Sequence, residues 1–209
     1  MSKKYRIALT VIGIFLILLI ALSVSVKIFG KSNDKKATVK TSVVDEMDKY
    51  GYFLDDRDTK IFKQTYYELK EILENEEIDY KLYGEKISQL FVIDLFTISN
   101  KISKYDVGGL EYIYKEEQDM FKNKVMDTLY EHVEDNSYGT RNQKLPTVKS
   151  VITDDVEETT YKVDEKKLDA YKYFITIEYE EDLDYDKKCS VEVVKDNKVM
   201  YVVEYTAIK

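Results

Sequence analysis

The sequence predicts an α+β fold in which three helices pack on a curved antiparallel sheet of about four strands, after an N-terminal transmembrane helix. Three observations carry this prediction. Residues 7–26 form an apolar run without charge, helical periodicity follows as far as about residue 133, and the period then changes to two. Because helices and strands occupy separate parts of the chain, the helices are expected to cover one face of the sheet.

The apolar run follows a basic tail, residues 1–6, which carries Lys3, Lys4 and Arg6. At about 1.5 Å per residue, the run spans the ~30 Å hydrocarbon core of a bilayer. We interpret residues 7–29 as a transmembrane signal anchor. A cleaved signal peptide is the alternative, because Ser23 and Ser25 are small residues with suitable spacing. The anchor interpretation names as its membrane residues Ile7, Ile14, Leu18, Leu22 and Val26.

Residues 30–44 are polar and are interpreted as a tether, which leaves residues 45–209 as an extracytoplasmic α+β domain. Basic residues flank both ends of the anchor, so their count does not fix its orientation. Long domains cross largely regardless of charge, and the reverse orientation would carry the basic tail across the membrane. We therefore expect a single-pass cell-membrane protein with its C-terminal domain outside.

Residues 43–54 are expected to contain a short helix that docks on the domain, although Gly51 interrupts them. The first amphipathic helix is expected to begin near Asp58, a residue type favoured at helix N-caps. Its apolar side chains recur at spacings of three and four, which places them on one helix face. They are Phe62, Tyr66, Leu69 and Leu73.

The second helix is expected from about Leu82 to Ile102 and, being the most apolar stretch of the domain, near the centre of the core. Gly108 and Gly109 then break the chain. The third helix is expected from about Leu110 to Val133, with Glu117 as the one charged member of an otherwise apolar row. Glu117 is interpreted as facing an interface or groove, or else as the sign of a shifted register.

Residues 147–163 supply at least one strand, and the segments after them alternate apolar and polar side chains. Asp196-Asn197 lies between two β-rich runs and suits a tight hairpin turn. The predicted faces are Tyr171, Tyr173, Ile175, Ile177 and Tyr179 in one strand, Cys189, Val191 and Val193 in the next, and Val199, Tyr201, Val203, Tyr205 and Ala207 in the last.

From Lys31 onward the chain has 28 basic and 40 acidic residues, a net charge of −12. Such a domain is repelled by nucleic-acid backbones and by anionic lipid headgroups, which argues against binding nucleic acid. One Cys and one His exclude an intramolecular disulfide, a cysteine-rich zinc cluster and any site with two imidazoles.

The order of elements resembles the nuclear-transport-factor-two-like (cystatin-like) cone fold, in the membrane-anchored version of inner-membrane scaffold subunits of type IV secretion and conjugation systems. The resemblance rests on the apolar helix QLFVIDLFTISNKI, the Gly108-Gly109 break and the strands YKYFITIEYEEDL and CSVEVVKDNKVMYVVEY. It implies a non-catalytic role in assembly. It carries over no functional residue, because no motif is matched.

The only candidate ligand-binding residues are two carboxylates, Asp94 and Glu117. Some cone folds hold a carboxylate in an apolar hollow, which raises its pKa. Asp94 lies between Ile93 and Leu95 in the most apolar helix, but a place on the solvent side of that helix is the favoured interpretation. No catalytic residue, metal ligand or cofactor is expected.

Three other features carry weaker chemical signals. Asp182, Asp184 and Asp186 resemble the start of a calcium loop, but Lys187 stands where that loop needs Gly. His132 lacks an evident partner for catalysis, and Cys189 is expected to be a buried apolar residue.

We therefore expect a non-catalytic, membrane-anchored interaction or scaffold protein of a bacterial cell envelope, which has a protein partner or self-associates. The alternative is a module that binds or senses a small ligand in the hollow of the cone. An enzyme that uses a buried carboxylate is the third possibility.

Overall fold

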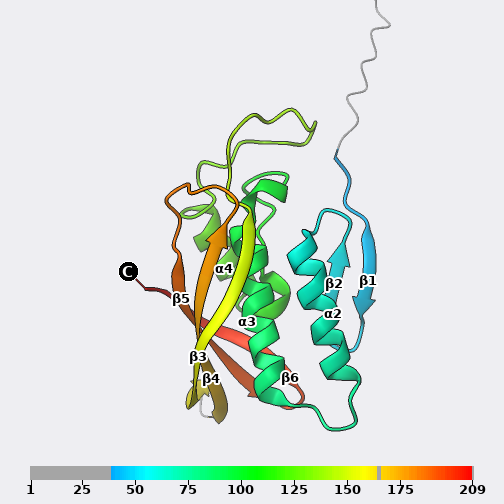
Figure 1. Cartoon of the computed structure of the whole chain (residues 1–209), viewed down its shortest axis with the longest axis vertical. Coiled ribbons are helices and arrows are strands. Elements are labelled where there is room, and N and C mark those ends of the chain that lie inside the picture. Colours follow the sequence, from blue (N-terminus) through cyan, green and yellow to red (C-terminus); the bar gives the residue numbers. More distant parts are fainter. Residues whose placement is uncertain (1–38, 164–165, 209) are drawn as a thin grey trace, which may run out of the picture. The chain divides into compact units, whose positions relative to one another are not determined.

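The computed structural model describes residues 39–163 and 166–208 and has the predicted α+β organisation (Figure 1). Three α-helices precede a curved antiparallel sheet of four strands, and a two-stranded hairpin opens the described part. In chain order the elements are β1 (Val43–Met47), β2 (Tyr52–Asp55), α2 (Lys60–Glu74), α3 (Tyr80–Phe96), the 3-10 turns η1 (Ile98–Asn100) and η2 (Leu110–Tyr112), α4 (Gln118–Met126), β3 (Val148–Val163), β4 (Lys166–Tyr179), β5 (Lys188–Asp196) and β6 (Val199–Ala207).

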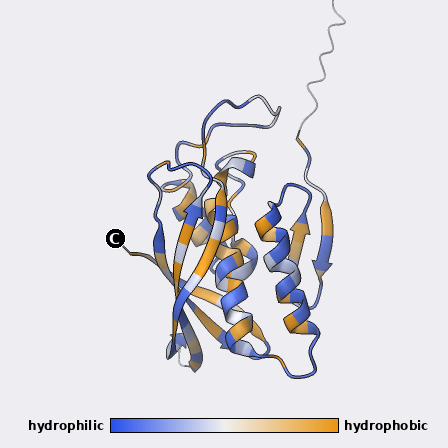
Figure 2. Cartoon of the chain, viewed as in Figure 1, coloured by the Kyte–Doolittle hydropathy of each residue, from blue (hydrophilic) through white to orange (hydrophobic). Residues whose placement is uncertain are grey.

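The four-stranded sheet is a simple meander with the order β3-β4-β5-β6, so that β3 and β6 form its edges. Its strands confirm the predicted change of period, because Tyr173, Ile175 and Ile177 of β4 are buried while their neighbours are more exposed. The same alternation is visible as hydrophobic and hydrophilic bands along the strands (Figure 2). The predicted turn is also present: Asp196 pairs with Val199, and Asn197 adopts a positive φ of 56°.

α3 is the central element of the core, as its composition predicts. Eleven of its 17 residues are buried, and it packs against strands of the sheet and against α2. Gly84 permits the close approach to β4, since a Cβ atom there would lie 2.6 Å from the Tyr173 hydroxyl oxygen. The covered face of the sheet is therefore filled with side chains, and Cys189 is fully buried among them.

A cluster of tyrosines joins the beginning of the domain to its end. The hydroxyl oxygens of Tyr52 in β2 and Tyr83 in α3 lie 2.7 Å apart. Tyr52 also donates to the backbone carbonyl of Met200 in β6, at 3.2 Å, and the Met200 amide donates to Tyr83, at 3.4 Å. Hairpin, central helix and last strand thus share one buried hydrogen-bonded cluster.

The predicted face of the last strand is wrong over its first half. Met200 and Val202 are the buried residues there, and a β-bulge at Val203 shifts the register between the pairs Val193–Val202 and Glu192–Glu204. An extra residue reverses the alternation, which brings Tyr205 onto the same face as Met200 and Val202. Period-two reasoning cannot follow a strand through such a bulge.

The short helix expected within residues 43–54 is absent, and β1 and β2 form a hairpin in its place. Tyr52 and Leu54 are buried whereas Phe53 is exposed, which is the alternation of a strand. Gly51 supplies the positive φ, 74°, at the turn. The glycine that interrupts the helical pattern is therefore the turn of the hairpin.

Helix boundaries differ from the prediction in three places. α2 is capped by Thr59 rather than Asp58, and α3 ends at Phe96 rather than near Ile102. The long third helix is wrong: residues 110–112 form a 3-10 turn, and α4 covers only residues 118–126. Residues four apart drift by about 40° around a helix at each step, so a row with that spacing does not stay on one face for 24 residues.

No helix among the described residues is long and apolar enough to cross a bilayer. The predicted anchor, residues 7–29, and most of the tether lie outside the described residues.

Candidate functional site

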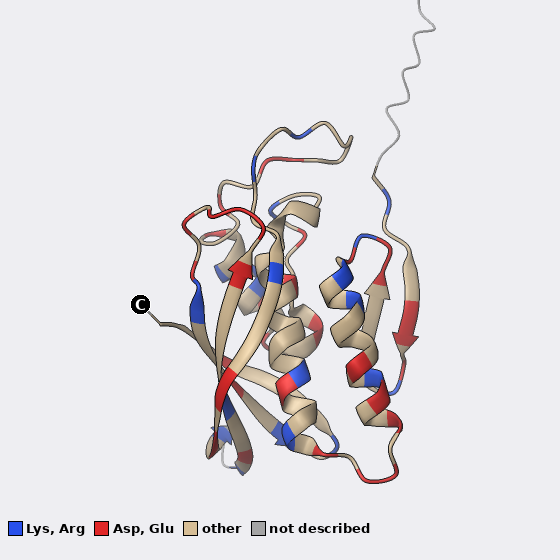
Figure 3. Cartoon of the chain, viewed as in Figure 1, with Lys and Arg blue, Asp and Glu red and all other residues tan. Residues whose placement is uncertain are grey.

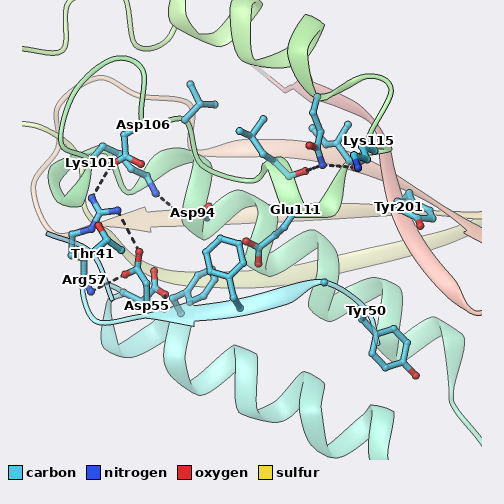
Figure 4. Close-up of a pocket in the computed structure, with 18 residues that line it drawn as sticks. Thr41, Tyr50, Asp55, Arg57, Asp94, Lys101, Asp106, Glu111, Lys115 and Tyr201 are labelled. Atoms are coloured by element: carbon cyan, nitrogen blue, oxygen red, sulfur yellow. Dashed lines mark hydrogen bonds and ion pairs between the residues drawn. The ribbon is translucent and has the colours of Figure 1, made fainter. Parts of the chain in front are cut away.

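A cavity of about 780 Å³ lies between the β1–β2 hairpin and the segment that connects α3 to α4 (Figure 4). Its walls come from distant parts of the sequence: Tyr50 from the hairpin, Asp58 before α2, Asp94 from α3, Glu111 from η2 and Tyr201 from β6. We call this the charged cavity, because it gathers eight charged side chains. They are Asp55, Arg57, Asp58, Asp94, Lys101, Asp106, Glu111 and Lys115.

The turn between β2 and α2 places three of these groups. Asp58 accepts a hydrogen bond from the backbone amide of Asp55, at 2.6 Å, and Asp55 accepts one from the amide of Arg57, at 2.7 Å. Asp side chains commonly bond to nearby backbone amides in this way, and such bonds stabilise tight turns. Through these bonds the run DDRDT, residues 55–59, forms a compact turn that holds its carboxylates next to the N-terminus of α2.

Arg57 is paired on two sides. It donates to Asp106 at 2.7 Å, to Asp55 at 3.3 Å and to the carbonyl of Asn100 at 2.9 Å. Burial raises the pKa of Asp106, but the hydrogen bonds from Arg57 and the Ile102 amide, together with the charges of Lys101 and Arg57, outweigh it, so the pKa lies below its usual value. These contacts fasten the loop after α3 to the start of α2.

Asp94 and Lys101 form an ion pair in which Lys101 is only 6% exposed. Asp94 also accepts a hydrogen bond from the backbone amide of Gly109, at 2.6 Å. Gly109 adopts a positive φ of 80°. Burial lowers the pKa of Lys101, but Asp94, together with Tyr130 and Asp106, more than offsets this and raises the pKa above its ordinary value. The expectation that Asp94 lies on the solvent side of its helix is therefore wrong, because its carboxylate neutralises Lys101 and fixes the loop.

Two carboxyl groups of the charged cavity, Asp58 and Glu111, make no ion pair among the described residues. Burial, followed by the carboxylates of Asp55 and Asp94, raises the pKa of Asp58 to about 7. Burial and the Asp94 carboxylate raise the pKa of Glu111 well above its usual value. The Tyr112 hydroxyl and the Phe53 amide oppose that shift only in part.

Glu111 is half-buried as a residue, but its Oε1 atom is fully buried and has no hydrogen-bond partner among the described residues. The Tyr50 hydroxyl and Arg57 Nε, which also belong to lining residues, are unsatisfied as well. The Tyr66 hydroxyl, whose pKa is raised by burial, by Asp45 and by Glu111, is unsatisfied too. Buried polar atoms in proteins are usually hydrogen-bonded, so this cluster calls for an explanation.

The second depression is a groove of about 620 Å³ between α4 and β6, which we call the α4–β6 groove. Met120, on its α4 side, is 70% exposed. Four charged residues border it: Glu117, Lys124, Asp186 and Glu204. Its apolar lining consists of Phe91, Leu95, Phe96, Ile113, Met120, Phe121, Val125, Leu129, Val202, Val203 and Tyr205.

The structure separates the two carboxylates that the sequence singled out. Asp94 lines the charged cavity and Glu117 borders the α4–β6 groove. Glu117 stands at the N-cap position of α4 and is exposed. The two residues therefore belong to different sites.

Sequence reasoning missed the residues that matter most in the charged cavity, which are Glu111, Asp58, Arg57 and Lys101. One pattern in the sequence could have indicated an ion-pair cluster, because three acidic residues surround a single arginine in the run DDRDT. From the sequence, Asp58 is expected only as a helix cap. Glu111 gives no local signal, because Asp94 and Asp58 approach it only through the tertiary fold.

The remaining candidates do not form a site. The Asp182 carboxylate binds Lys187 at 2.6 Å, and no three His, Cys, Asp or Glu side chains of the described residues are grouped as metal ligands. His132 is 88% exposed at its side chain, and its Nε2 lies 3.9 Å from the Glu131 carboxylate. Burial raises the pKa of the Cys189 thiol to about 12, so it is not a nucleophile at neutral pH.

Comparisons with protein-family models, with curated proteins and with solved structures found no match for this chain. The functional argument therefore rests on the cavity, the groove and the surrounding charges.

Proposed function

We propose that this chain is a non-catalytic, membrane-anchored interaction protein of a bacterial cell envelope, whose α+β domain binds a protein partner outside the membrane. The observation that carries the proposal is the α4–β6 groove, an apolar depression beside an edge strand of the sheet. The covered face of the sheet is filled with side chains, which argues against a ligand hollow in the middle of the cone.

The groove suits a basic, amphipathic segment of a partner. Its floor is apolar, and Met120 offers an exposed apolar contact at its border. Three of its four charged residues are acidic, and the chain from Lys31 onward has a net charge of −12. Acidic loops also lie between α2 and α3 and between β4 and β5 (Figure 3). Complementary charge favours a partner segment that carries Lys or Arg.

The membrane part of the proposal rests on the sequence. Residues 7–29 supply the anchor and residues 30–44 the tether. The order of three helices and a four-stranded meander supports the resemblance to cone-shaped scaffold subunits of type IV secretion and conjugation systems.

The partner is tested by replacing Met120 with a photo-cross-linking amino acid in the full-length protein in its native membrane. We expect one discrete adduct whose cross-linked segment is apolar and basic, and which a synthetic peptide of that segment abolishes. The same replacement at Ile152, an exposed residue of β3, is the matched control. Equal adducts at both positions, or an acidic partner segment, would contradict the proposal.

Anchoring is tested separately by extracting membranes with alkaline carbonate. We expect the full-length chain to stay in the membrane pellet and a variant without residues 1–30 to be released. Release of an intact full-length chain would refute the anchor.

One observation favours the second candidate, a small-ligand module. The charged cavity lies outside the filled centre of the sheet and holds unsatisfied buried atoms. A domain can carry such a site in addition to a partner groove.

A further inference from the structure

We propose that the charged cavity binds a small organic cation, a molecule with a protonated amine attached to an apolar body, and that the ammonium group pairs with the Glu111 carboxylate. This site is distinct from the α4–β6 groove, although Ile113 lines both.

The first argument is the charge balance of the lining. Five of the charged residues are acidic and three are basic. Arg57 is paired with Asp55 and Asp106, Lys101 is paired with Asp94, and Lys115 is exposed. Asp58 and Glu111 are thus left over, and a cation is the ligand that would balance them.

The second argument is the unsatisfied oxygen. Oε1 of Glu111 is buried without a hydrogen-bond partner, and the Glu111 side chain points into the cavity (Figure 4). An ammonium group has three donors, so it can pair with the Glu111 carboxylate and satisfy its free oxygen.

The third argument is the aromatic wall. Phe53, Phe62, Tyr50 and Tyr201 line the cavity. Aromatic faces attract organic cations, and their rings also cover an apolar ligand body. The combination of an unpaired carboxylate with aromatic rings distinguishes an amine from an inorganic ion.

Other ligand classes fit less well. An organic anion would meet five carboxyl groups, and the two cations that lie deepest already have partners. A calcium ion takes six to eight oxygen ligands, and the described residues show no such grouping.

Binding of the cation should release a proton, because the free carboxyl is held in its neutral form. The groups that face Glu111 are Asp94 of α3, Asp58 before α2, Tyr66 of α2, Tyr52 of β2 and Tyr112 of η2. None of these groups is a cation, and the Tyr112 hydroxyl and the Phe53 amide stabilise the charged carboxylate only in part, so a bound ammonium group would stabilise it further. Affinity should therefore rise with pH, and the heat of binding should depend on the buffer.

The test uses titration calorimetry on the full-length protein in detergent with three molecules of one shape: phenethylamine, phenethyl alcohol and phenylacetate. We expect the amine to bind, the alcohol to bind at least about tenfold more weakly and phenylacetate not to bind. We expect the heat for the amine to differ between phosphate and Tris buffers at one pH.

Variants decide whether the site is the one proposed. Glu111→Gln should weaken amine binding at least about tenfold and abolish proton release, and Asp58→Asn should weaken it less. Glu116→Gln, the same change at an exposed residue outside the lining, should leave binding unchanged. Because Gln resembles the neutral carboxyl, the thermal unfolding of Glu111→Gln should match that of the natural protein. Equal binding of amine and alcohol, no amine binding up to about 10 mM, or unchanged binding by Glu111→Gln would overturn the proposal.

Discussion

Removal of the buried Lys101 side chain should strongly destabilise this domain. Its ammonium group is almost fully buried and is paired with Asp94, which also holds the backbone of Gly109. Lys101→Ala leaves an uncompensated buried carboxylate, and we expect it to lower the free energy of unfolding by about 3–5 kcal/mol in urea denaturation. Lys144→Ala breaks a pair that is exposed on both sides and should cost less than about 1 kcal/mol. Similar losses for the two variants would show that the buried pair is not critical.

The pKa of Asp58 predicts how stability depends on pH. In the fold this pKa is about 7, against 3.8 for an ordinary Asp, so the folded protein keeps a proton that the unfolded chain releases. The contribution of Asp58 to the free energy of unfolding should therefore fall as pH rises from about 4 to 7 and level off above that range. Asp58→Asn should make the decline of the free energy of unfolding with pH shallower, by an amount that corresponds to at most about one proton released on unfolding.

Chemical denaturation at several pH values measures this slope. Asp48→Asn, the same change at an exposed residue, should leave it unaltered. An unchanged slope in Asp58→Asn would mean that other carboxyls, such as Glu111, produce the dependence.

Among the elements, the strands could be predicted best. Alternation in β4 follows directly from burial of one sheet face, so Tyr173 is predicted correctly. In β5, Val191 is buried as predicted, but Ser190 and Val194 of the opposite face are buried as well. The bulge at Val203 and the end of the third helix could not be predicted, because both depend on contacts with other elements. The same reason hid Glu111, whose environment exists only in the folded chain.

Helix α3 offers a test at the scale of an element. Its N-cap Asp79 accepts hydrogen bonds from the amides of Lys81 and Leu82, at 3.0 and 3.1 Å. Asp79→Ala should lower the free energy of unfolding by about 1 kcal/mol, and Asp79→Ser should restore most of it. Glu76→Ala, at an exposed site before the helix, is the control. Thermal or urea unfolding that does not separate Asp79→Ala from Glu76→Ala would contradict the role of the cap.

At the scale of the whole molecule, the lone thiol allows the membrane orientation to be measured. Cys189 is fully buried, whereas His132 is 88% exposed at its side chain. In intact cells, a maleimide that cannot cross membranes should label His132→Cys if the domain lies outside and should leave the natural protein unlabelled. Labelling of His132→Cys only after the cells are opened would place the domain inside.

The tyrosine cluster has a consequence for how the chain is made. Tyr52 and Tyr83 complete their bonds only with the backbone of Met200, which lies 148 and 117 residues later in the sequence. During synthesis, the part of the α3 surface that β6 covers therefore stays exposed until β6 has emerged. A chain that stops before β6 lacks the strand that closes its core, which makes such a fragment a target for chaperones and proteases.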